Sequence, residues 1–71
     1  MKRVKFDDWE VGKRYFVKCG IWQGKLIYCG LFAGWGSSIA RPLFTFGTLE
    51  TWRENFNIHA AKSNIKCYTL D

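Results

Sequence analysis

Apolar and polar residues alternate along residues 14–19, whose sequence is RYFVKC. Successive side chains of a β-strand point to opposite faces, so this alternation predicts a half-buried strand. One face holds Tyr15, Val17 and Cys19, and the other holds Arg14, Phe16 and Lys18. Gly12 precedes the strand and permits a sharp turn into it.

The next apolar segment, residues 26–32, differs because apolar residues occur at both parities. A strand of this kind is buried on both faces or is strongly bent. Gly30 stands within it, and a glycine inside a strand favours a bulge or a barrel corner. Residues 20–24, GIWQG, join the two strands as a short connection with Trp22 near its tip.

Residues 29–42, CGLFAGWGSSIARP, combine glycines with a tryptophan. A phosphate-binding glycine loop needs a helix behind its glycines, but strand-like residues flank this stretch on both sides. We therefore interpret it as a hairpin tip in which Gly34 and Gly36 adopt positive φ angles and Trp35 is carried between them. A third strand follows over residues 38–47, with Pro42 at an edge or a bulge because proline cannot donate to the ladder.

The hydrophobic period changes after the third strand. Leu49, Trp52 and Phe56 stand at positions i, i+3 and i+7, which is the spacing of one face of a helix. Thr48 precedes them as an N-cap residue. The pattern therefore predicts one short helix of one or two turns near residues 48–56.

The remaining chain completes a mainly β fold. Residues 57–64 suit either a short strand or a turn, and residues 65–70 alternate again and predict a last strand. Four or five strands with one short helix in 71 residues favour a small SH3-like antiparallel barrel, whose closure hides the strand edges. We expect a single domain over residues 1–71, in which residues 1–8 form a lead-in that is free to be flexible. Four Trp, three Tyr and six Phe residues indicate a core built largely from rings.

Charge suggests a partner. The formal net charge is +5, and most of the basic residues lie in the first half of the chain. Such an excess favours a polyanion such as nucleic acid, a nucleotide-bearing ligand or an acidic protein face, and we expect the basic face of the first two strands to bind it. A basic surface that only aids solubility is the alternative. The predicted anion-binding residues are Lys13, Arg14, Lys18, Lys25 and Trp22, with Lys2, Arg3 and Lys5 in the lead-in. In a meander, Trp22 and Trp35 lie at opposite ends of the sheet, and Trp22 lies near the turn after the third strand, within reach of Trp52.

Exposed aromatic residues suggest a second class of function. A tryptophan on a tight loop has few neighbours to bury it, and exposed rings are common at interfaces. Trp35, Phe32 and Arg41 are the predicted partner-binding residues. The chain would then be an inhibitor or adaptor of the kind that phages and mobile elements encode, and it would bind a host protein. Folding of Trp35 back over the open end of the barrel is the other interpretation.

The sequence contains no pattern typical of a catalytic site or a metal-binding site. Cys19, Cys29 and Cys67 are odd in number and lack metal-binding spacing, so we expect reduced thiols and a cytoplasmic location. His59 is the single histidine and has no evident nucleophile beside it. We therefore expect no enzymatic activity, cofactor or metal, and no membrane segment, because none approaches the ~20 apolar residues that span a bilayer. A monomer and a homodimer both remain open.

Overall fold

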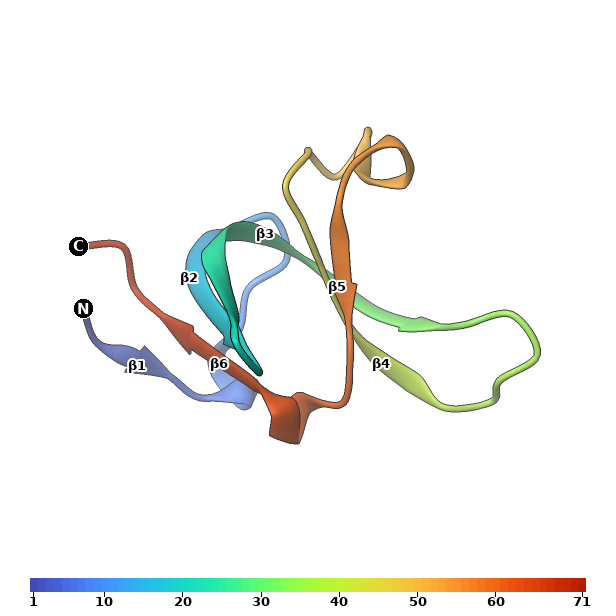
Figure 1. Cartoon of the computed structure of the whole chain (residues 1–71), viewed down its shortest axis with the longest axis horizontal. Coiled ribbons are helices and arrows are strands. Elements are labelled where there is room, and N and C mark those ends of the chain that lie inside the picture. The colour runs from blue at the N-terminus through green and yellow to red at the C-terminus, as the bar shows by residue number, and fades with distance from the viewer.

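The computed structural model describes all 71 residues and contains one six-stranded antiparallel sheet (Figure 1). The strands are β1 (Arg3–Val4), β2 (Arg14–Cys19), β3 (Trp22–Ala33), β4 (Ala40–Thr45), β5 (Asn57–His59) and β6 (Ile65–Tyr68). Three single 3-10 turns connect them, η1 (Phe6–Asp8), η2 (Trp52–Glu54) and η3 (Lys62–Asn64). The strand order is β1-β6-β2-β3-β4-β5. Figure 1 shows the two termini close together and the β3–β4 hairpin extending to the opposite side.

A mainly β chain is confirmed, but the closed SH3-like barrel is wrong because the sheet has two free edges. β6 is paired with β1 on one side and with β2 on the other. Both sides of β6 are therefore occupied, and it cannot also pair with β5, which is bound only to β4. The edge strands are β1, with two residues, and β5, with three. Edges this short offer few unpaired backbone groups to other chains.

The expected helix near residues 48–56 is also wrong, because this segment holds only turns and η2. Thr48 does cap the turn, since its hydroxyl accepts hydrogen bonds from the backbone N–H groups of Glu50 and Thr51 at 3.2 Å. The three apolar residues of the helical pattern nevertheless have separate partners. Leu49 lies against Gly12, Trp52 packs on Phe32, and Phe56 packs on Trp22. A helix of two turns is unstable by itself, so these tertiary contacts determine the local structure.

β2 has the predicted bounds, and Tyr15 and Val17 are buried as the alternation requires. The connection after it is shorter than predicted. Trp22 is the register partner of Cys19, so only residues 20–21 form the turn, and the placement of Trp22 near a tip is wrong. Gly20 has a φ of 61°, the positive value that a two-residue turn of type II′ needs at its first position.

The long strand β3 bends where glycine allows it. The register of β3 against β4 shifts between Tyr28 and Gly30, and Gly30 has a φ of 102°, so the predicted bulge is confirmed. At the hairpin tip, the Ser37 N–H donates to the Gly34 carbonyl at 3.0 Å. Gly36 has the predicted positive φ, 75°, whereas Gly34 does not, so that part of the prediction is wrong.

The other strands follow from simple limits on pairing. Pro42 lies in β4 just outside Leu43–Thr45, the segment that pairs with β5, so the strand has an open side at the proline. Residues 57–64 form both of the structures that their pattern allowed, first β5 and then η3. Within the expected lead-in, Arg3–Val4 pairs with β6 and provides a sixth strand.

The core fills the concave side of the sheet. It consists of Tyr15, Val17, Leu26, Tyr28, Phe44, Ile58, Ile65 and Cys67. Trp9 closes the open side, with its ring centroid 5.5 Å from that of Tyr28 and 5.3 Å from that of Phe44, both edge to face. Its indole N–H donates to the Val4 carbonyl at 3.0 Å, which satisfies the polar end of the ring. Rings supply much of this core, as the composition predicts.

The three thiols differ in burial, and the buried ones make the free energy of unfolding depend on pH. Burial raises the pKa of Cys67 from 9.0 to about 12, although Arg3 lowers it somewhat, and burial also raises the pKa of Cys29. Above pH ~9 the thiol of the unfolded chain ionises while buried Cys67 stays protonated. The unfolded state then loses protons first, so the free energy of unfolding falls between pH ~9 and ~12 and is unaffected below.

We therefore expect urea unfolding to show a loss of stability from pH ~9 to ~10 that is shallower in Cys67→Ala, at up to about 1.4 kcal/mol per pH unit for a single group. A Cys67→Ala variant whose stability has an unchanged pH slope would contradict the assignment of this loss to Cys67.

In the folded protein at neutral pH, a thiol reagent should modify half-buried Cys19 before the other two cysteines.

Candidate functional site

Strand pairing arranges the cations of this protein into rows. Directly paired residues in an antiparallel sheet project from the same face. Phe16 of β2 is paired with Tyr68 of β6 on one side and with Lys25 of β3 on the other. Tyr68 is paired in turn with Arg3 of β1, so one row of side chains crosses four strands. The next row pairs Lys18 with Lys66.

We call this convex surface, which faces away from the core, the basic face. Its members are Arg3, Arg14, Lys18, Lys25 and Lys66 around the rings of Phe16 and Tyr68. All five cations are exposed, and no aspartate or glutamate occurs in β1, β2, β3 or β6. The single ion pair of the structure, between Lys13 and Glu10, involves none of them. The basic face therefore carries five positive charges without a neutralising partner.

Two aromatic rings occupy the middle of the basic face. The ring centroids of Phe16 and Tyr68 lie 6.5 Å apart with a tilt of 53°, and both side chains are half-buried. The Lys18 ammonium lies 5.4 Å from the Tyr68 centroid and 6.0 Å from the Phe16 centroid. These distances fall within the range of a cation–π interaction, so Lys18 is held over both rings.

A polar hollow adjoins the rings. It has a volume of about 250 Å³ and is lined by Lys18, Gly20, Asn64 and Lys66, none of which is hydrophobic. Like charges placed directly opposite each other in a sheet repel, and no carboxylate relieves this pair. An anion seated between Lys18 and Lys66 would remove that repulsion.

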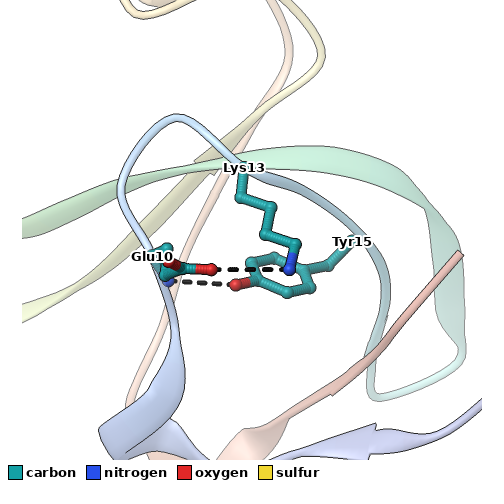
Figure 2. A network of polar contacts seen from close by, with 3 residues as sticks. All are labelled: Glu10, Lys13 and Tyr15. Carbon is teal, nitrogen blue, oxygen red and sulfur yellow. Dashed lines mark hydrogen bonds and ion pairs between the residues drawn. The ribbon is translucent and has the colours of Figure 1, made fainter.

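The structure brings Arg14, Lys18 and Lys25 together on this face with Arg3 of the expected lead-in, but it places Lys13 elsewhere. The Lys13 ammonium lies 3.4 Å from a carboxylate oxygen of Glu10 and 5.7 Å from the centroid of the Tyr15 ring (Figure 2). The Glu10 N–H also donates to the Tyr15 hydroxyl at 3.0 Å. Lys13 is thus part of a local network that fixes the turn before β2.

Trp22 also lies away from the basic face, on the side of the core. Its ring stacks on Phe56 at a centroid distance of 5.4 Å and meets Phe46 edge to face at 5.6 Å. It lies so close to Gly24 that a side chain there would collide with it. Trp22 is therefore near the turn after β4, as predicted, but Trp52 is not its partner.

Sequence reasoning missed three members of the basic face, namely Phe16, Lys66 and Tyr68. Their parity was readable, because Phe16 alternates with buried Tyr15 and Val17, and Lys66 and Tyr68 share the polar side of the last strand. The sequence contains no signal that β6 would lie beside β2. Without that neighbour, Phe16 is an isolated exposed ring.

The predicted partner-binding residues lie on the β3–β4 hairpin. Trp35 is fully exposed at the tip, so it does not fold back onto the sheet. Arg41 is exposed and is the register partner of Phe32. Phe32 is half-buried beneath Trp52, with ring centroids 5.2 Å apart, and its carbonyl is 2.7 Å from His59 Nε2.

An apolar groove runs along the other side of this hairpin. It has a volume of about 430 Å³ and is lined by Phe6, Leu31, Ile39, Ala40, Arg41, Pro42, Ala61 and Lys62. Leu31 and Ile39 are both more than half exposed. The hairpin therefore presents apolar side chains that the fold itself does not cover.

The basic face can bind an anion through the ammonium and guanidinium donors of its five cations. No three His, Cys, Asp or Glu side chains gather anywhere in the structure in a group that could hold a metal ion. None of the helical turns in the structure has the length and hydrophobicity to cross a bilayer.

Comparison with known proteins found no protein-family model, no curated protein sequence and no solved structure that matches this chain.

Proposed function

We propose that this protein is a cytoplasmic, non-enzymatic binding module that holds a polyanionic partner, nucleic acid or a nucleotide-bearing ligand, on the basic face. The observation that carries the proposal is the gathering of five exposed, unpaired cations on four adjacent strands that contain no acid. Phosphate groups are the abundant cellular anions that such a surface attracts.

The three acidic residues that precede β2 form no ion pair with the basic face. Asp7, Asp8 and Glu10 stand close to β2 in the sequence, where they could neutralise its cations. In the fold, Asp7 and Asp8 belong to η1, and Glu10 is bound to Lys13 and to the Tyr15 hydroxyl. None of these three carboxylates therefore forms a salt bridge with a cation of the basic face.

Binding of this kind must depend steeply on salt. If five cations each neutralise one phosphate, the logarithm of the binding constant falls by about 3.5–4.5 per tenfold rise in salt. Between about 50 and 200 mM salt, the affinity then falls by about 100- to 500-fold.

The double variant K18E/K66E tests the proposal. Each lysine that loses a phosphate contact should weaken oligonucleotide binding by at least about tenfold and reduce the salt slope by about one. Fluorescence anisotropy with a labelled oligonucleotide at both salt concentrations measures this. K62E/R53E is the matched control with the same change of net charge, because the Lys62 ammonium lies 4.5 Å from the Phe6 ring centroid and the Arg53 guanidinium lies 4.7 Å from that of Trp52, and neither residue belongs to the basic face. An equal loss in both proteins would mean that only net charge matters, and no binding at low salt would refute the proposal.

A second candidate function, that of an inhibitor or adaptor bound to a host protein, is favoured by one observation. Trp35 is fully exposed at the tip of the hairpin that carries the apolar groove. A tryptophan held out in this way is a typical anchor of a protein interface. Arg41 and Lys62 line the same groove, so an apolar partner segment with acidic residues fits it best.

Trp35→Ala separates the two functions. Because the ring is fully exposed, we expect its removal to change the free energy of unfolding by less than about 0.5 kcal/mol. Oligonucleotide binding should also be unchanged. The second function is tested by immobilising the unaltered chain and the variant and passing cell lysate over both. If the chain is an inhibitor or adaptor, the unaltered chain captures a protein that the variant does not. Capture of the same proteins by both would exclude Trp35 as an anchor.

A further inference from the structure

We infer that the ligand of the basic face is a single-stranded nucleic acid whose bases stack on Phe16 and Tyr68. This inference rests on the proposed function, since it concerns the same face, and it adds the form of the polyanion. It depends on the position of the two rings relative to the surrounding cations.

The rings lie at the centre of the cationic surface. Phe16 and Tyr68 occupy the two inner positions of the row across β1, β6, β2 and β3, and Arg3 and Lys25 occupy the outer two. Three interstrand spacings of about 4.8 Å give this row a length of roughly 14 Å. A phosphate backbone that follows the cations therefore passes directly over the rings.

Duplex and single strand differ in what they offer to such rings. A duplex keeps the faces of its bases stacked inside and presents phosphates and groove edges to a protein. A single strand exposes the faces of its bases, and these stack on aromatic side chains regardless of sequence. A duplex would use only the cations, whereas a single strand would use the cations and the rings.

Folding alone does not require these rings. Both project from the face opposite the core cluster, and their aromatic contact is with each other. A solvated outer face normally carries polar residues in an antiparallel sheet. The Lys18 ammonium lies over both rings in the free protein, so a stacking base takes its place and the flexible lysine turns toward the adjoining phosphate.

The polar hollow provides a place for the phosphate. Lys18 belongs both to the ring cluster and to the hollow that it lines with Gly20, Asn64 and Lys66. A base stacked on Tyr68 therefore has a phosphate site next to it. The rings therefore match the base of a nucleotide, and the polar hollow matches its phosphate.

The test uses the whole chain and its F16L/Y68L variant, which keeps apolar bulk on the strands but removes both ring faces. The probes are labelled oligothymidylate and oligouridylate of about 12 nucleotides, the corresponding duplex, and a base-free strand with the same number of phosphates. Trp35→Leu is the matched control, because it removes an exposed ring outside the basic face. Urea unfolding of each protein verifies the fold.

We expect both single strands to bind more tightly than the duplex and the base-free strand. The double variant should lose about 5- to 140-fold per ring toward the single strands and almost nothing toward the base-free strand.

Two failures would have different meanings. If the duplex and the single strands bind equally and F16L/Y68L has no effect, the stacking inference is overturned while charge-dependent binding stands. If no probe binds at low salt, or K18E/K66E binds as well as the unaltered chain, the proposed function itself is overturned.

Discussion

The pairing of β6 with β2 is the interaction on which the rest of this structure depends. It joins the last strand of the chain to its first long strand and places Cys67 opposite Val17 in the core. The same pairing places Tyr68 beside Phe16 and Lys66 beside Lys18 on the outer face. Because a shift of one residue would turn every side chain of β6 to the other face, the burial of Ile65 and Cys67 fixes the register of the basic face as well.

This arrangement separates the residues of one strand that stabilise the core from those that we propose to bind a partner. Along β2, Tyr15 and Val17 point into the core, while Phe16 and Lys18 point outward. Substitutions on the outer parity therefore leave the core contacts in place. The openness of the sheet follows from the same topology, since β6 uses both of its sides for β1 and β2, and Trp9 takes over the covering role that a closed barrel would give to another strand.

Local features of the fold were predictable where short-range chemistry decides them. The alternation of residues 14–19 gave the bounds and faces of β2, and Gly30 marked the bulge of β3. Long-range contacts were not predictable. Leu49, Trp52 and Phe56 have helical spacing, but Leu49 lies against the turn before β2 and the other two pack on opposite ends of β3, and no local signal shows this. For the same reason, the sequence identified Arg14, Lys18 and Lys25 but could not place Phe16 beside Tyr68, which lies in the last strand.

The energetic cost of the basic face supports the proposal that it binds a partner and does not only aid solubility. A chain of 71 residues has a free energy of unfolding of only about 4–10 kcal/mol. Placing Lys18 directly opposite Lys66 costs a few tenths of a kcal/mol to about 1 kcal/mol of that margin. Solubility needs net charge but no particular arrangement, and cations spread over the loops would supply it without this repulsion. The juxtaposition of the two lysines beside two rings is what an anion with an attached base would exploit, because its phosphate converts the repulsion into attraction.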